Sequence, residues 1–219
     1  MKKIFATLLA ASLLLIGTQA NAQLVPGAGY LYASEKASNS DNAIAHNGFY
    51  LGASYNVPIV AGLGVAPGIY VDMLFRGKSS GEGNSSSNYY LAKNYREFAV
   101  NVPINVNYKF TFNRNAALMF YAGPTFQVGV ISKSTYSGEL NVFGVKLIEG
   151  SETINYYDKD SAGSLARNRF NMSVGGGIGF QAGDLLFTVG YDRSLLNYAK
   201  SDNYTTSRNY IKAGINFAF

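Results

Sequence analysis

Strict alternation of side-chain type between Glu97 and Phe110 is the feature that most narrows the possible folds. One parity of this segment is apolar, and it comprises Phe98, Val100, Val102, Ile104, Val106, Tyr108 and Phe110. The other parity is small, polar or charged, and it comprises Glu97, Ala99, Asn101, Pro103, Asn105, Asn107 and Lys109. A helix would mix the two sets around its circumference, and only an extended chain separates them. The segment is therefore predicted to be a β-strand with one apolar face.

Seven further segments follow the same period, the first of them weakly. They are residues 27–38, 48–58, 64–78, 118–129, 169–181, 185–192 and 210–219. Short links near residues 60–62, 113–115 and 182–184 alternate with long polar links at 39–47, 79–94, 138–168 and 200–207. Even strand number, short turns at one end and long loops at the other are typical of membrane barrels. The predicted fold is all-β, an eight-stranded antiparallel up-and-down transmembrane β-barrel.

The first 22 residues have the pattern of a secretory signal peptide. Lys2 and Lys3 precede an apolar run, and a small-x-small site ends at Ala22. We therefore expect a signal peptide at 1–22 and a barrel domain at 23–219, with an N-terminal anchor helix as the alternative. Loss of the two lysines lowers the formal net charge from +5 to +3, which is too mild to indicate a nucleic-acid partner. Cysteine is absent, which excludes disulfides and thiol chemistry.

The apolar face is predicted to point outward to lipid. The opposite face is rich in Gly, Ala, Ser and Asn, which suit a narrow interior, and a soluble barrel with an aromatic core is the alternative. Apolar-face aromatics gather towards both strand ends, as in the two girdles of membrane barrels. The opposite face also carries single charges that we expect to pair inside the lumen, since a buried charge needs a partner. These charges are Asp72, Arg76, Glu97, Lys109, Arg169, Asp192 and Lys212.

Taken together, these segments resemble the outer-membrane β-barrel (porin-family) domains of Gram-negative bacteria, and in size the small eight-stranded OmpX and OmpA barrels. The resemblance rests on residues 47–52 (NGFYLG), on the strand from Glu97 to Phe110, on residues 121–124 (YAGP) and on the terminal Phe219. It implies residence in the outer membrane, with its lipid and lipopolysaccharide as partners. It also implies that the barrel assembly machinery reads the closing strand through Ile215, Phe217 and Phe219.

No catalytic, cofactor or metal site is predicted. Some eight-stranded outer-membrane barrels modify lipid A with a His and a Ser, but the single histidine, His46, is expected to be a loop residue without a suitably spaced serine. One histidine and scattered carboxylates show no metal-ligand spacing. The glycine-rich stretch 174–179 lacks the Lys-Ser/Thr ending of a phosphate loop. Inward glycines there are instead expected to leave room for Tyr70 or Tyr121.

Tyrosines in the long polar links suggest a binding surface. Tyr89, Tyr90, Tyr156 and Tyr157 lie among Ser, Asn and Gly, a mixture also used by antibody binding loops. A host surface or a glycan is the expected partner, and a solvated loop set is the alternative. The favoured function is therefore a structural or surface-interaction role. A narrow porin is the first alternative, although eight strands enclose only enough space for side chains. A lipid A-modifying enzyme is a distant alternative.

Overall fold

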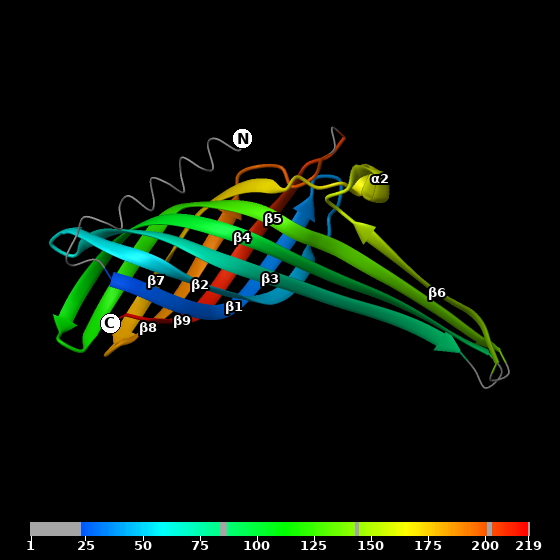
Figure 1. The fold of residues 1–219 in the computed structure, drawn as a ribbon, viewed down its shortest axis with the longest axis horizontal. Coiled ribbons are helices and arrows are strands. Elements are labelled where there is room, and N and C mark those ends of the chain that lie inside the picture. Colours follow the sequence, from blue (N-terminus) through cyan, green and yellow to red (C-terminus); the bar gives the residue numbers. More distant parts are fainter. Residues whose placement is uncertain (1–22, 84–86, 143–144, 201–202, 219) are drawn as a thin grey trace.

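The computed structural model describes residues 23–83, 87–142, 145–200 and 203–218, so the predicted signal peptide and Phe219 lie outside the described residues. Nine strands and two short helical turns are present in this part of the chain (Figure 1). The strands are β1 (Gln23–Ala37), β2 (Ile44–Val60), β3 (Leu63–Gly83), β4 (Ser87–Asn113), β5 (Ala116–Val142), β6 (Val145–Asn155), β7 (Phe170–Ala182), β8 (Leu185–Ser194) and β9 (Thr206–Phe217). The helical turns are α2 (Lys159–Ala162) and η1 (Gly163–Leu165). In the described ranges, neither is long and apolar enough to cross a membrane.

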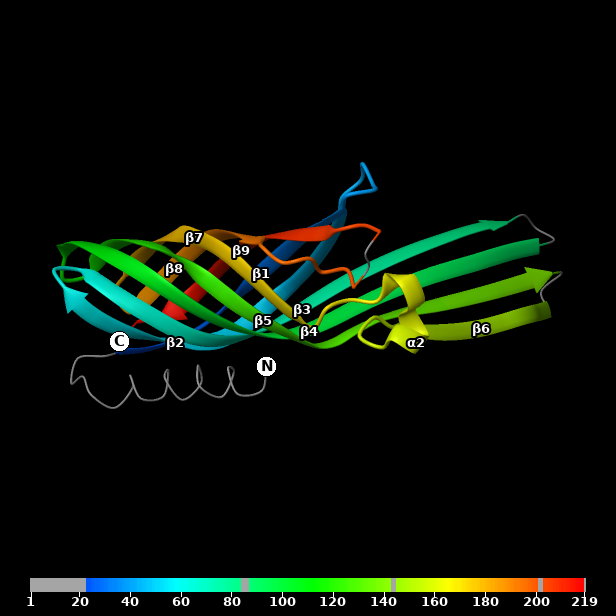
Figure 2. The same cartoon turned by 90° about the horizontal axis from the view of Figure 1, so that it is seen from above.

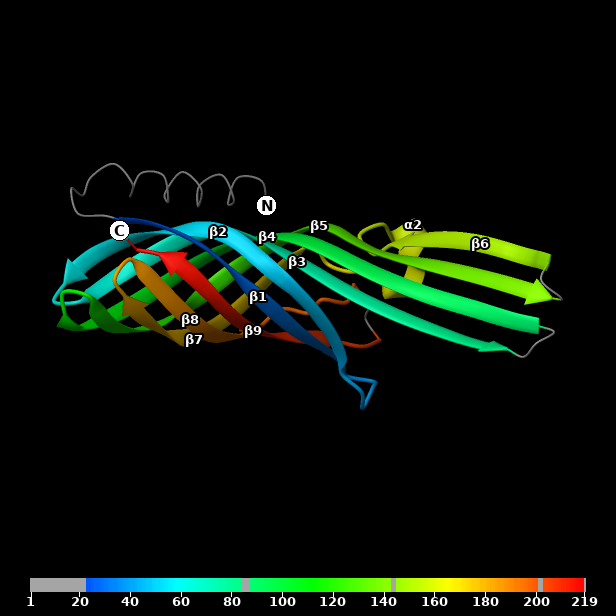
Figure 3. The same cartoon turned by 90° about the horizontal axis from the view of Figure 1, so that it is seen from below.

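Eight of the strands close into an antiparallel ring. The order is β4-β3-β2-β1-β9-β8-β7-β5, and pairing of β4 with β5 completes the circle. Figure 3 shows the first and last strands of the chain, β1 and β9, side by side, which is the seam of an up-and-down barrel. The ninth strand, β6, pairs only with β5 among the described strands and lies outside the ring. The predicted eight-stranded antiparallel barrel is confirmed.

Three tight turns join the strands at one end of the ring. In the first, Ala61 and Gly62 have φ of 42° and 86°, the left-handed conformation that suits the twist of a two-residue hairpin. Gly183 has φ of 59° in the third turn. The end of β9 lies at this same end (Figure 1), so the long connections all lie at the opposite end.

Strands β3, β4 and β5 continue well past the ring and, with β6, form a four-stranded sheet that we call the arm (Figures 1 and 2). The arm comprises residues 76–83, 87–95, 134–142 and 145–155. Its register is regular, and one row runs Lys78, Lys93, Tyr136, Glu152. This corrects the prediction of polar loops for residues 79–83, 87–94, 138–142 and 145–155, whereas residues 156–168 form a connection that contains α2 and η1. Both faces of the arm are polar, so the two-residue period that marks a strand with one apolar face is absent there.

The outer surface of the ring is apolar and its interior is polar. Exposed outward side chains include Phe49, Leu51, Ile69, Val71, Val106, Phe110, Phe120, Phe180, Phe187, Val189, Ile211 and Ile215. Buried inward side chains include Asp72, Glu97, Asn101, Asn107, Thr125, Gln127, Asn171 and Ser173. Near the arm, Phe75 packs between Phe49 and Phe98 with ring centroids 5.8 and 6.2 Å away. The prediction of an outward apolar face is therefore confirmed.

Candidate functional site

A buried arginine holds two buried glutamates together across the upper lumen, where "upper" denotes the end nearer the arm. Arg208 of β9 is fully buried. Its Nη2 donates to Glu35 Oε2 of β1 at 2.6 Å, and its Nη1 donates to Glu97 Oε1 of β4 at 2.6 Å. Two further bonds, Nε to Glu35 Oε2 and Nη2 to Glu97 Oε2, measure 3.1 and 3.0 Å. The guanidinium therefore bridges three strands of the ring that are distant in sequence.

A second arginine completes the charge balance from outside the strands. Arg167 follows η1, and its Nη2 donates to Glu35 Oε1 at 2.6 Å while its Nη1 lies 3.5 Å from Glu97 Oε2. Burial opposes the charged form of Arg167, but Tyr95, Glu35 and Glu97 together outweigh it and raise the pKa of the guanidinium. Two carboxylates and two guanidiniums give a neutral network, the condition under which buried charges are tolerated. We call these four residues the upper cluster.

Two connecting segments cover the lumen above this cluster. The Tyr198 hydroxyl reaches down to Gln127 and Tyr210, and its ring lies 4.3 Å from the Arg208 guanidinium carbon. The segments, residues 195–200 and 156–169, are also bonded to each other, since the Asn168 backbone amide donates to the Tyr198 carbonyl at 2.9 Å. Figure 1 shows both segments over the upper end of the ring, near α2. Network and segments together therefore occupy the upper end of the lumen.

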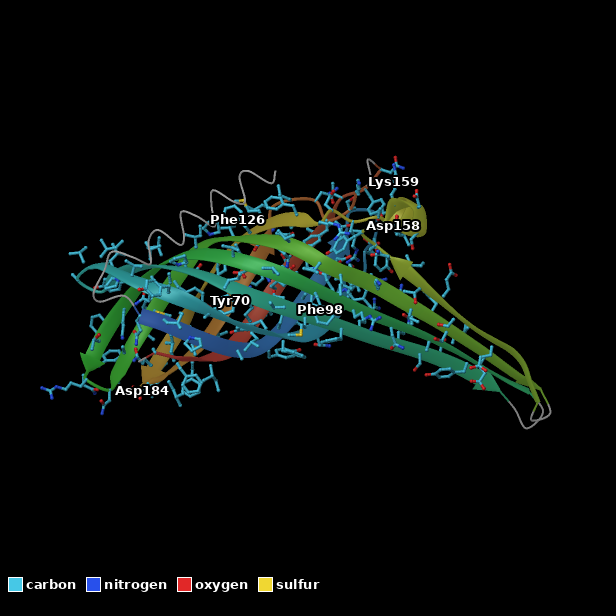
Figure 4. All side chains as sticks on the ribbon, viewed as in Figure 1. Tyr70, Phe98, Phe126, Asp158, Lys159 and Asp184 are labelled. Carbon is cyan, nitrogen blue, oxygen red and sulfur yellow. The ribbon has the colours of Figure 1, made fainter. Side chains whose placement is uncertain are left out.

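The lower half of the lumen contains a second set of charges and a cavity of about 140 Å³. Lys212 Nζ lies 2.9 Å from Asp192 Oδ2. Asp72 is buried beside them, and its Oδ1 has no hydrogen-bond partner among the described residues. Lys109 lines the same cavity near the short turns. In Figure 4 Asp184 marks this short-turn end, and Asp158 and Lys159 lie beyond the opposite end.

The seven charges that were predicted to lie in the lumen occupy different environments. Asp72, Glu97, Asp192 and Lys212 lie inside the ring, and Lys109 lines its cavity. Arg76 is partly exposed at the base of the arm. The prediction is wrong for Arg169, which is exposed. Because it lies just before β7 begins, its guanidinium rests 4.7 Å from the Tyr157 ring centroid and donates to the Val130 carbonyl at 3.4 Å.

Sequence reasoning missed Glu35, Arg167, Arg208 and the position of His46. His46 was expected in a loop, but β2 begins at Ile44 and the side chain is only 2% exposed. Its ring packs 4.7 Å from that of Tyr95, and its Nε2 is 4.0 Å from Glu35 Oε2. Neither ring nitrogen has a hydrogen-bond partner among the described residues. Within that part of the chain His46 therefore does not form a His–Ser pair.

Inward glycines make room for a tyrosine, as expected. A Cβ added to Gly177 or to Gly190 would overlap the hydroxyl of Tyr121. Glycine at these two neighbouring positions is thus required by the close approach of the Tyr121 side chain, which comes from the adjacent strand β5 and lies over β7 and β8. The prediction for the glycine-rich stretch is confirmed for Tyr121.

The predicted loop contacts and assembly residues lie in different environments. Tyr90 is 50% exposed on the arm, and the side chain of Tyr89 lies outside the described residues. The prediction is wrong for Tyr156, which is buried and donates to Ser134 Oγ at 3.0 Å. Tyr157 is half-buried, and burial raises the pKa of its hydroxyl. Ile215 and Phe217 are exposed on the outer face of β9.

Comparison with known proteins finds similar solved structures at low sequence identity. No family model and no curated protein matches the chain. Ail, the attachment invasion locus protein of Yersinia pestis, solved in complex with the heparin analogue sucrose octasulfate, is 16% identical, with a TM-score of 0.43 over 90% of this chain and 99% of that one. Neisserial surface protein A is 11% identical (TM-score 0.44, 91% and 99%), and the outer membrane enzyme PagL is 10% identical (0.40, 87% and 99%). These likenesses concern the fold alone.

Proposed function

We propose that this chain is an outer-membrane barrel with a closed lumen, whose role is surface interaction through the arm rather than conduction or catalysis. The apolar outer surface of the ring supports a lipid environment, since a closed barrel leaves no open edge within a bilayer. Export by the signal peptide at 1–22 and insertion by the barrel assembly machinery would bring it to the outer membrane. There, lipid and lipopolysaccharide surround it and the arm projects outward from the cell.

The length of the arm is the observation that carries this proposal. Eleven residues separate Phe98, at the upper aromatic girdle, from Ser87 at the tip of β4. At ~3.3 Å per residue the strand reaches about 36 Å along its own direction beyond the girdle. Such a reach would carry the tip beyond the lipid headgroups. Near the tip, Tyr90 and Leu91 are 50% and 53% exposed, and they offer contact area to another surface.

The partner class that fits the arm is a host surface or a glycan. On the face that continues the barrel interior, Lys78 and Lys93 are directly opposite each other. Lys93 also lies 4.8 Å from the Tyr136 ring centroid. Lysine cations beside an aromatic ring suit sugars that carry acidic groups. The exposed backbone of nearby Ser and Gly residues suits such sugars as well.

Shortening the arm tests the proposal. The register allows a clean excision, with Arg76 joined to Tyr95 and Ser134 joined to Ile154 through two-residue Asn-Gly turns, which removes Lys78, Lys93 and Tyr136. The ring and the upper cluster are untouched, so the variant should fold and remain heat-modifiable on a gel. Binding of whole cells to host cells or immobilised glycans is expected to fall to the level of cells that lack the protein. Unchanged binding by the shortened variant would refute the proposal.

Two other activities have direct readouts. Refolded residues 23–219 are expected to give no discrete conductance steps in a planar bilayer, because the upper cluster and the two covering segments fill the lumen. Reproducible conductance steps would instead favour a narrow porin. Turnover of lipid A by the purified protein would favour the enzyme reading, and none is expected because His46 faces the lumen rather than lipid.

A further inference from the structure

Two cations stand directly opposite each other on the outer face of the arm base. Arg96 of β4 pairs in register with Lys133 of β5. Directly opposite residues on one face of an antiparallel pair have Cβ atoms about 4.5–5.5 Å apart, and like charges there are destabilising. Arg96 is exposed and Lys133 is half-buried. Among the described residues, no carboxylate lies within 4.0 Å of either side chain. Their mutual repulsion therefore has no counter-charge from the described chain.

The height of this pair on the barrel is fixed by the rows beneath it. The next outward row down is Phe98 with Ile131, and Val130 beside it is 52% exposed. Phe75, which pairs with Arg96 on the other side, belongs to the upper aromatic girdle. Figure 4 labels Phe98 near the point where β4 leaves the ring. Arg96 and Lys133 thus occupy the first row above the apolar belt, where a lipid headgroup would begin.

A third cation lies close by, just before the start of the neighbouring strand β7. Arg169, one of the exposed side chains, donates to the carbonyl oxygens of Gly129 and Val130 at 3.5 and 3.4 Å, both through Nη1. Among the described residues, no acceptor lies within hydrogen-bond distance of its Nε or Nη2, so these groups can still donate to an anion. Arg169 therefore adds a cation beside Val130, one row below Lys133 on β5. Exposed guanidinium and ammonium groups recognise phosphate through charge-assisted hydrogen bonds.

We propose that Arg96 and Lys133, flanked by Arg169, bind a phosphate group of an outer-leaflet glycolipid such as lipopolysaccharide. The inference rests on the proposed outer-membrane location. That location implies contact with lipid in general, and the inference names residues that make one such contact. A soluble anion could reach these side chains too, but a lipid phosphate is held at their height by the bilayer and so has a high local concentration. The site differs from the lysine pair on the opposite face of the arm, which faces away from lipid.

Purified protein refolded in phospholipid vesicles that contain a small fraction of lipopolysaccharide provides the test. The variant R96S/K133S is compared with R114S/K159S, which removes two exposed cations that belong to neither proposed binding surface. Capture of lipopolysaccharide is expected to weaken about tenfold or more in R96S/K133S, since bonds to charged groups are the strong ones. R114S/K159S should bind like the unchanged protein, and enzymatically dephosphorylated lipopolysaccharide should bind all three proteins weakly.

Several outcomes would overturn the assignment. Equal capture by R96S/K133S, or undiminished capture of the dephosphorylated glycolipid, would show that phosphate is not held by these cations. Equal retention of phosphatidylglycerol, or full competition by inorganic phosphate, would show a general anion site instead of a glycolipid site. Flotation of the protein with the vesicles separates this failure from failure of the proposed location. A protein that floats but shows no phosphate dependence lacks only the site, whereas one that does not float contradicts the membrane proposal itself.

Discussion

Replacement of Arg208 by methionine tests whether the upper cluster holds the ring together. Arg208 makes four hydrogen bonds to Glu35 and Glu97, at 3.1, 2.6, 2.6 and 3.0 Å. Both glutamates are nearly fully buried, with 6% and 2% exposure. Methionine retains much of the side-chain volume, so the change removes charge and hydrogen bonds with little loss of packing. The variant R208M is left with two buried carboxylates and only Arg167 to neutralise them.

The expected loss of free energy of unfolding is set by the uncompensated negative charge of the two glutamates. Removing one partner of a buried ion pair typically costs about 3–5 kcal/mol, because the other partner stays buried without compensation. The double variant R208M/E97Q keeps one carboxylate and one guanidinium, Glu35 and Arg167, and is neutral again. Contacting residues in one network couple by about 0.5–3 kcal/mol. The double variant should therefore lose less free energy of unfolding than the sum of the two single variants.

Equilibrium unfolding by urea in detergent micelles or thin bilayers measures these differences. The chain has no tryptophan, so far-UV circular dichroism of the strands is the natural signal. The four proteins of the cycle are the unchanged protein, R208M, E97Q and R208M/E97Q. Stability of R208M within about 0.5 kcal/mol of the unchanged protein would refute the reasoning, because that is the size of ordinary surface substitutions. Additive losses in the double variant would show that the two charges do not act as a pair.

Two smaller predictions concern packing in the lumen. His46→Phe should change the free energy of unfolding by less than about 1.5 kcal/mol in the same urea assay, because the ring keeps its contact with Tyr95 and the histidine nitrogens make no hydrogen bond in the described chain; a larger loss would reveal a polar role. Gly190→Ala should cost about 1–3 kcal/mol, since the new methyl group overlaps the Tyr121 hydroxyl. Gly190→Ala combined with Tyr121→Phe should recover most of that loss, and a lack of recovery would contradict the assigned clash.

Alternation identified the ring because lipid on one side and a crowded lumen on the other impose two different faces on each strand. The segment from Glu97 to Phe110 is the clearest case, and the structure keeps all of it within β4. The same reasoning did not detect the arm, although the arm continues strands of the ring. Lys78, Lys93 and Glu152 lie in one regular row, but both faces of that row are polar. Without a buried face, side-chain type carries no period from which to recognise the strand.

Only part of the upper cluster could be predicted from the sequence. Arg208 has the same parity as Lys212, so extending the last strand backwards by two residues would have placed it inward. Glu35 lies in the weakly alternating first strand, where parity was hard to assign. Arg167 lies outside every strand, and no periodicity predicts a side chain that enters the lumen from a connecting segment. Charges that meet through long-range closure of the ring are therefore the least predictable part of this site.

Arg167 also links the upper cluster to the arm, and this link can be tested by proteolysis. It lies in the segment that returns from β6 to the ring, and it is held there by Glu35 and Glu97. R167M should release that segment and speed cleavage at the exposed Lys159 by a lysine-specific protease, since cleavage follows local opening. R208M should not speed this cleavage, because Arg167 then remains bound to both carboxylates. This is expected although R208M lowers the global free energy of unfolding more than R167M does. Faster cleavage in R208M than in R167M would show that global opening, and not the Arg167 anchor, controls this segment.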